Sequence, residues 1–123
     1  MSEIYDRGSE GVRALTRYLG EKGRKVEASN NKTFDLRVDG VYAEVKSTRD
    51  RYSKLGFIGL TDNQFAALEA GVEFILFIVC NLQAPKDLEV IEITSAKLRA
   101  ETPKKECTYY WYRSQLERLQ RKS

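Results

Sequence analysis

The sequence predicts a single α/β domain, with some α+β character, in which a mixed β-sheet is flanked by helices. Three observations predict it: an N-terminal stretch with helical spacing of its apolar residues, two alternating stretches joined by a tight turn, and one run that is apolar throughout. The chain of 123 residues has room for one domain over 1–123 and is too short for two independent cores. The expected order of elements is α-β-β-β-α-β-β-α.

The first 60 residues predict a helix, three strands and a loop. Apolar and small residues recur at spacings of three and four, which predicts a helix over 3–22 that stops at Gly23. The pair Asp39-Gly40 is a strong signal for a two-residue hairpin turn. The strands are expected at 25–29, 34–38 and 41–46, and the polar stretch 50–59 is expected to be a loop.

The second half of the chain predicts two more strands between helices. Thr61 or Asp62 can cap a helix that ends near Ala70. Residues 73–80 form an apolar run typical of a strand buried on both faces. A further strand is expected at 88–94, a helical turn at 95–100, and an amphipathic helix from Tyr109 onward with Tyr109, Tyr112, Leu116 and Leu119 on one stripe.

The chain contains no histidine, and this excludes several kinds of chemistry. Catalytic triads, Cys-His dyads and histidine-bound metal centres all need one. Two cysteines, Cys80 and Cys107, cannot complete a zinc site without histidine, so any metal is expected to be Mg²⁺ or Mn²⁺ bound by oxygen. Their settings favour free thiols, which predicts a cytoplasmic protein. No apolar run approaches the roughly 20 residues that span a bilayer, and no apolar signal region begins the chain, so no membrane partner is expected.

Charge is unevenly distributed along the chain. The net charge is +3, yet residues 61–100 hold three basic and six acidic residues, whereas 101–123 hold six and three. Basic residues also follow the third expected strand, at Arg49, Arg51 and Lys54. Basic surface beside acidic residues suits a polyanion held near a metal site. An ordinary solvated surface is the alternative, and charge by itself favours it.

The hairpin brings two carboxylates together. A two-residue turn sets Asp35 opposite Glu44, with Lys46 two residues further along the same face. The other face is expected to be buried and to consist of Phe34, Leu36, Val38, Val41, Ala43 and Val45. Opposed carboxylates repel unless a cation lies between them, so the pair is a candidate divalent metal site with Lys46 beside a water. In the alternative, Arg37, diagonal to Glu44, neutralises a solvated acidic pair.

Asp35 followed by Glu44-Val45-Lys46, on two strands after an N-terminal helix, resembles the PD-(D/E)XK nuclease superfamily. The resemblance implies a restriction-endonuclease-like core and metal-assisted hydrolysis of phosphodiesters. It implies that Asp35, Glu44 and the Val45 backbone carbonyl bind Mg²⁺, for which Mn²⁺ can substitute, and that Lys46 orients or activates the attacking water. Gln64 falls where many members carry a glutamine on the second helix.

Within that superfamily the chain is most similar to the archaeal Holliday-junction resolvases, over roughly residues 5–80. The similar positions are Arg7, Gly8, Ser9, Arg13, Leu19, Lys22, Gly23, Val26 and the segment from Glu44 to Ser47. The resolvases' first-helix glutamate aligns with Val12, and Glu10 lies nearly opposite the apolar stripe on a helical wheel. A second likeness, to nuclease-like domains within larger proteins, is carried by Glu44 to Thr48 and by Phe57 to Gln64.

These resemblances imply a Mg²⁺-dependent DNA endonuclease that selects structured DNA in recombination or repair. A homodimer is expected because symmetric cutting of a junction needs two active sites. The residues expected to contact DNA are Arg7, Ser9, Ser47, Arg49, Arg51 and Lys54. The alternative is a catalytically weakened DNA-binding or defence-associated accessory module that keeps the fold. The aromatic run from Tyr109 to Tyr112 can cap the core, form a dimer interface or stack on unpaired bases.

Overall fold

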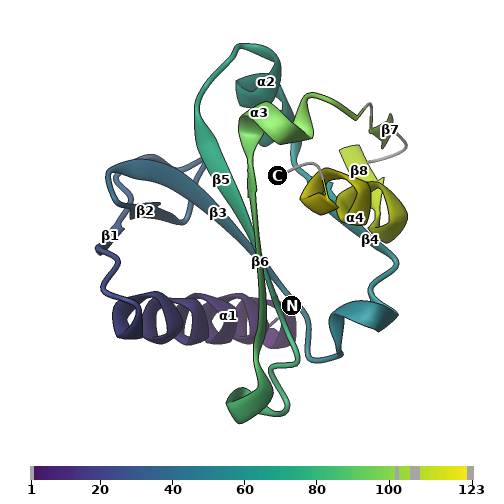
Figure 1. The fold of residues 1–123 in the computed structure, drawn as a ribbon. Coiled ribbons are helices and arrows are strands. Elements are labelled where there is room, and N and C mark those ends of the chain that lie inside the picture. The colour runs from purple at the N-terminus through teal and green to yellow at the C-terminus, as the bar shows by residue number, and fades with distance from the viewer. Residues whose placement is uncertain (1, 102, 106–108, 122–123) are drawn as a thin grey trace.

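The main layer of the molecule is a five-stranded mixed sheet in the order β1-β2-β3-β5-β6 (Figure 1). The computed structural model describes residues 2–101, 103–105 and 109–121, with side chains from residue 10 onward other than those of 104, 105 and 109. Strands β3 and β5 are parallel, and the other neighbours are antiparallel. The strands are β1 (Val26–Ala28), β2 (Leu36–Val38), β3 (Val41–Ser47), β5 (Phe74–Cys80) and β6 (Glu89–Thr94). The predicted mixed sheet flanked by helices is confirmed.

Helix α1 (Ser2–Glu21) covers one face of this sheet and crosses the lower part of Figure 1. Leu15 and Leu19 are fully buried in the cluster that α1 forms with the sheet. The helix approaches β3 closely at Gly11, where a Cβ atom would lie 2.5 Å from the Oγ atom of Ser47. Only glycine at this position lets the helix axis lie so close to the strand.

A second layer covers the opposite face of the sheet. Strands β4, β8 and β7 form a three-stranded antiparallel sheet of their own, beside α4 at the right of Figure 1. Ile58, Leu60 and Trp111 of this small sheet pack with Leu116 and Leu119 against the main sheet. The elements of the layer are β4 (Phe57–Leu60), α2 (Asp62–Glu69), α3 (Ser95–Leu98), β7 (Lys104–Lys105), β8 (Tyr109–Tyr112) and α4 (Arg113–Arg121), and two 3₁₀ turns are η1 (Tyr52–Lys54) and η2 (Pro85–Asp87).

All seven residues of β5 are buried, as the apolar run predicts. Phe77 and Val79 pack on the side of α1, whereas Leu76 and Ile78 pack on the side of the second layer. The thiol of Cys80 is free, and burial raises its pKa to about 12, so it packs as a small apolar group. The expected free thiol at Cys107 lies outside the described residues. Among the described residues, no helix is long and apolar enough to cross a bilayer.

The β2–β3 hairpin has the predicted turn and register. Asp39 and Gly40 both have positive φ, 51° and 83°, which is the backbone of a type I′ turn. The paired residues are Leu36 with Ala43, Arg37 with Tyr42 and Val38 with Val41. One residue departs from the predicted face: Phe34 precedes β2 and packs on the side of the second layer, with its ring stacked at 5.2 Å on Tyr42. The alternation of side chains along β2 does not determine the direction of Phe34, because Phe34 lies outside the strand.

Two expectations about irregular and helical segments are wrong. The stretch 50–59 is not only a loop, because it contains η1 and most of β4. The tail from Tyr109 does not begin as a helix, because its first four residues form β8 and only then does α4 start. In both cases the cause is one long-range pairing, β4 with β8, which sets Ile58 opposite Trp111. Local periodicity carries no information about a partner more than 50 residues away.

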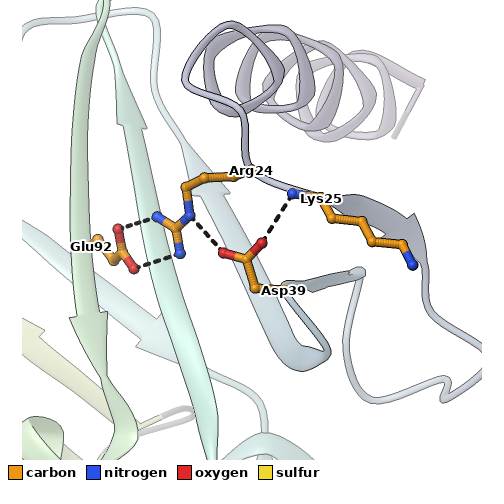
Figure 2. Close-up of polar contacts among 4 residues, drawn as sticks. All are labelled: Arg24, Lys25, Asp39 and Glu92. Carbon is orange, nitrogen blue, oxygen red and sulfur yellow. Dashed lines mark hydrogen bonds and ion pairs between the residues drawn. The ribbon is translucent and has the colours of Figure 1, made fainter.

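The turn end of the hairpin is held by a network of charged side chains (Figure 2). The guanidinium of Arg24 donates to the Oδ2 atom of Asp39 at 2.9 Å and to both carboxylate oxygens of Glu92 at 2.7 and 3.1 Å. The backbone N–H of Lys25 donates to the Oδ1 atom of Asp39 at 3.0 Å. These contacts lower the pKa of Asp39, the Lys25 N–H more than the Arg24 side chain, and they raise the pKa of Arg24. The network ties the end of α1, the hairpin turn and β6 together.

Candidate functional site

The four polar residues that the sequence singled out for catalysis come together where β2, β3 and α2 meet. Asp35 lies just before β2, Glu44 and Lys46 lie on β3, and Gln64 lies in the first turn of α2. The backbone N–H of Asp35 donates to the Ala43 carbonyl at 3.1 Å, although Ala43 is the ladder partner of Leu36, so the ladder ends there and does not include the predicted pair of Asp35 with Glu44. Asp35 still lies beside the middle of β3, but outside the ladder register that the sequence predicts.

The Asp35 carboxylate is held against the backbone of β3. Its Oδ2 atom accepts a hydrogen bond from the Val45 N–H at 3.0 Å. A residue in a strand directs its N–H and its C=O toward the same neighbouring strand, so the Val45 carbonyl is directed to the side of Asp35 as well. The resemblance to the nucleases implies that this carbonyl binds a metal together with Asp35.

Glu44 is a buried carboxylate with one oxygen paired and one oxygen unsatisfied. The residue is 5% exposed, and its Oε2 atom lies 3.1 Å from the Nζ atom of Lys46. Its Oε1 atom is buried without a hydrogen-bond partner among the described residues. An unsatisfied buried carboxylate oxygen is costly, so a proton or a cation at this atom stabilises the site.

The electrostatics of Glu44 agree with that geometry. The pKa of Glu44 is raised to about 7, chiefly by burial and also by the charge of Asp35, while Lys46 and Gln64 act in the opposite direction. Removal of a carboxylate from water disfavours its charged form, which is the largest cause here. Near neutral pH this group therefore exchanges between its protonated and charged forms.

Gln64 is fixed by its own helix terminus. Thr61 and Gln64 form a reciprocal capping box: the Gln64 N–H donates to the Thr61 hydroxyl at 3.2 Å, and the Thr61 N–H donates to the Oε1 atom of Gln64 at 3.0 Å. The Nε2 atom of Gln64 donates to the Thr33 carbonyl at 3.2 Å. The side chain thus ties α2 to the segment before Asp35 and lies close enough to Glu44 to lower its pKa.

The alternative of a solvated acidic pair neutralised by Arg37 is wrong. Glu44 is buried because the second layer covers this face of the sheet. The Nη2 atom of Arg37 donates instead to the Gly40 carbonyl at 3.0 Å, and its guanidinium lies 5.7 Å from the centre of the Tyr42 ring. Arg37 is thus directed toward the hairpin turn and away from the acidic pair.

Sequence reasoning underestimated Glu10. The helical wheel directs it away from the apolar stripe, yet its Oε1 atom is buried and lies 3.6 Å from the Nη1 atom of Arg49. The close approach of Gly11 to Ser47 explains this, because it brings the adjacent turn of α1 to the carboxyl end of β3. The glycine next to an acidic residue was the available signal. Val12, by contrast, packs against the apolar cluster under α1.

The residues expected to contact DNA fall into three groups. Arg51 and Lys54 are exposed in and around η1. Arg49 is exposed and pairs with Glu10, and Ser47 lies against α1, on the opposite face of β3 from Glu44. The backbone positions of Arg7 and Ser9 lie in α1, but their side chains lie outside the described part of the chain.

The donor set fits a hard divalent cation. Carboxylate and carbonyl oxygens are the ligands that Mg²⁺ takes, and it is commonly bound through one or two carboxylates together with water and a substrate phosphate. Within the described residues, no group of three or more Asp, Glu, Cys or His side chains converges on one point. Asp35 and the unsatisfied Oε1 atom of Glu44 form a pair of carboxylates, which matches the Mg²⁺ sites that use two carboxylates with water and phosphate.

Comparison with known proteins places the chain in a family. The family model described as Protein NO VEIN, C-terminal matches residues 9–93. The chain belongs to this family. No curated protein and no solved structure matches it. The matched segment begins in α1 and ends in β6, so it contains Asp35, Glu44, Lys46 and Gln64, whereas β8 and α4 lie beyond it.

Proposed function

We propose that this NO VEIN C-terminal domain is a metal-dependent endonuclease that hydrolyses phosphodiester bonds in DNA, with a preference for branched or otherwise structured substrates. One observation carries the proposal: the buried Oε1 atom of Glu44 has no hydrogen-bond partner among the described residues, while its Oε2 atom is held by Lys46 and Asp35 lies close enough to raise its pKa. Two carboxylates and a lysine in this order resemble the PD-(D/E)XK nucleases and, among them, the archaeal Holliday-junction resolvases.

The proposed roles follow from what each group can do. Asp35, Glu44 and the Val45 carbonyl would hold Mg²⁺ or Mn²⁺, which when bound acts as a Lewis acid on phosphate and lowers the pKa of water. Lys46, whose side chain is about one quarter exposed, reaches both Glu44 and solvent, so it can orient a water and hold or accept its proton. The hydrogen bond from Val45 keeps Asp35 in place.

The metal site is tested by calorimetric titration of the metal-free protein with Mg²⁺ and Mn²⁺. We expect binding at millimolar metal in the wild type and none in Asp35→Asn, because the substitution removes one of the two carboxylate ligands. Asp39→Asn is the matched control, since it makes the same change on the same hairpin at a carboxylate already engaged by Arg24 and Lys25. Equal titration curves for the two variants would contradict the site.

Cleavage is tested with a panel of labelled four-way junction, flap, duplex and single-stranded DNA in the presence of Mn²⁺. The proposal expects wild type to cut at least one branched substrate and Asp35→Asn to cut none. Loss of all activity on EDTA addition is expected as well, since the ion supplies the Lewis acid. Wild-type protein that binds metal yet leaves the whole panel intact would overturn the endonuclease assignment.

A second candidate function is a DNA-binding module of weakened catalysis. It is favoured by the lack of a third acidic side chain converging on Asp35 and Glu44 within the described part of the chain. The same panel separates the candidates: binding of DNA without cleavage by the wild type supports the module, and metal-dependent cleavage supports the nuclease.

A further inference from the structure

The small sheet of the second layer has one buried face and one aromatic face exposed to solvent. Ile58, Leu60 and Trp111 are buried beneath it. Phe57 and Tyr112, which are paired in the β4–β8 ladder, are 54% and 42% exposed. Among the described residues, these two are the exposed large hydrophobic side chains. The alternation of the strands therefore directs aromatic residues outward, where a solvated face ordinarily carries polar residues.

The outward rings form one continuous cluster, which we call the aromatic face (Phe57, Tyr110 and Tyr112). The ring centres of Phe57 and Tyr110 lie 5.2 Å apart, and those of Tyr110 and Tyr112 lie 5.5 Å apart at a right angle. Gly59 occupies the ladder position opposite Tyr110 and adds no side chain to this face. Single exposed apolar residues are ordinary on protein surfaces, but a contiguous aromatic cluster marks a binding surface.

The surroundings of the aromatic face are predominantly basic. Lys54 and Arg51 are exposed in the segment that leads into β4. Arg113 follows Tyr112 directly, and its backbone N–H donates to the Gly56 carbonyl at 3.1 Å, beside Phe57. Its guanidinium is paired with Glu117 at 3.3 Å.

We propose that the aromatic face binds single-stranded nucleic acid by stacking its bases on Phe57 and Tyr112, with the phosphates near Arg51 and Lys54. Surfaces that bind single-stranded nucleic acid combine aromatic rings with basic residues. Base stacking tolerates any sequence because every base has a flat face. Positive charge favours a polyanion over an apolar partner surface. Lys54 lies three residues before Phe57 in the chain, and Arg51 lies three residues before Lys54, so the basic segment leads directly into the aromatic face.

The position of this face specifies a substrate class for the proposed nuclease, and that part of the inference rests on the proposed function. Strand β4 (Phe57–Leu60) leads directly into Thr61, the cap of α2, where Gln64 adjoins Glu44. At about 3.3 Å per strand residue, the exposed ring lies about 13 Å along the chain from that cap. A strand stacked on the aromatic face is thus a few nucleotides from the candidate site, which suits DNA with unpaired bases next to the cleaved bond.

The test measures binding in EDTA, where no metal-dependent cleavage takes place, so that it does not depend on the nuclease activity. The probe is a fluorescein-labelled oligothymidylate of roughly 12 nucleotides, with a blunt duplex as comparison, followed by anisotropy at low salt. We expect wild type to prefer the single strand. Phe57→Leu and Tyr112→Leu should each weaken that binding by about 10-fold, because leucine keeps an apolar side chain but removes the ring. Phe57→Trp should retain it.

Tyr18→Leu is the matched control, since it removes a ring on α1, on the other side of the main sheet. It should bind the oligonucleotide as wild type does. Both leucine variants should melt close to the wild-type temperature because the rings they remove are exposed. Wild-type affinity in Phe57→Leu and Tyr112→Leu, or a preference of wild type for duplex, would overturn the proposal.

A second copy of this chain could cover the aromatic face instead of a nucleic acid, and sedimentation equilibrium distinguishes the two. Conversion of a dimer to a monomer by Phe57→Arg would show that the aromatic face is an interface between copies and would overturn the strand-binding assignment; an unchanged mass supports it. The two proposals also fail separately. If binding in EDTA depends on the rings but no substrate is cleaved in Mn²⁺, only the nuclease proposal is wrong. If DNA is cleaved equally well after Phe57 and Tyr112 are replaced, only the strand-binding proposal is wrong.

Discussion

Two clusters at opposite ends of the β2–β3 hairpin contain the same charges, one cation and two carboxylates. At the turn end, all four carboxylate oxygens of Asp39 and Glu92 accept hydrogen bonds from Arg24 or from the Lys25 N–H, and both acids remain exposed. At the open end, Glu44 is buried and one of its oxygens has no partner among the described residues.

The difference separates a structural cluster from a candidate site. Charged groups on the surface whose hydrogen bonds are all made to one another leave no free acceptor for a ligand. Their role is to join elements of the fold. A buried carboxylate that lacks one hydrogen-bond donor lowers the stability of the fold, and such a cost is typical of sites that bind a ligand. The four predictions below contrast the two clusters directly.

The largest expected effect belongs to Lys46. Lys46→Ala should bind Mg²⁺ and DNA nearly as wild type does, yet cleave DNA at least about 100-fold more slowly, the usual size of a positioned acid–base contribution. Single-turnover cleavage at saturating protein measures it. Arg24→Ala is the control from the turn end and should cleave at the wild-type rate. Equal losses in the two variants would show that the open end has no special chemical role.

The second effect is on stability as a function of pH in metal-free protein. The pKa of Glu44 is raised from 4.5 to about 7, so between these values the folded state binds more protons than the unfolded state. The free energy of unfolding should therefore fall as pH rises from about 4.5 to 7, by up to about 3 kcal/mol at 1.36 kcal/mol per pKa unit.

Urea unfolding at pH 5 and pH 8 measures this fall. Glu44→Gln should remove it, because the amide keeps the shape of the side chain without a titrating group. Glu92→Gln, from the turn end, should retain the wild-type difference. The chain has no histidine to obscure the comparison. An identical fall in wild type and Glu44→Gln would contradict the raised pKa.

A smaller effect is expected from breaking the turn-end cluster. Arg24→Ala should lower the free energy of unfolding by about 1 kcal/mol, since its ion pairs are exposed and such pairs contribute little each. Thermal or urea unfolding at low and high salt measures it, and the loss should shrink at high salt. A loss of several kcal/mol would contradict the assignment of these contacts as ordinary surface ion pairs.

The smallest effect concerns single cations of the loop after β3. Removal of one phosphate contact, as in Arg51→Ala or Lys54→Ala, should reduce the slope of log affinity for DNA against log salt by about one unit. Lys25→Ala removes an equally exposed cation at the turn end and should leave the slope unchanged. Unchanged slopes in all three variants would exclude this loop from the DNA interface.

The sequence by itself determined the parts of the fold that depend on local signals. The spacing of apolar residues specified α1, the type I′ turn specified the register of β2 and β3, and the apolar run specified the buried strand β5. Strand alternation and the two-residue turn also predicted Glu44 and Lys46 on one face of β3 with Asp35 beside it, although the ladder itself ends at Leu36 and Ala43. Gln64 was singled out by the resemblance to the nucleases, and its place in the first turn of α2 agrees with the predicted cap at Thr61, a local motif.

Only the tertiary structure decided which of these groups are buried. Alternation identifies the residues that share a face, but it cannot say that a second layer covers that face; β4, β8 and α4 do so through a pairing of Phe57–Leu60 with Tyr109–Tyr112. That cover removes water from Glu44 and raises its pKa. The approach of Gly11 to Ser47 likewise carries Glu10 to the end of β3. Burial depends on contacts between segments distant in sequence, and no local pattern encodes those.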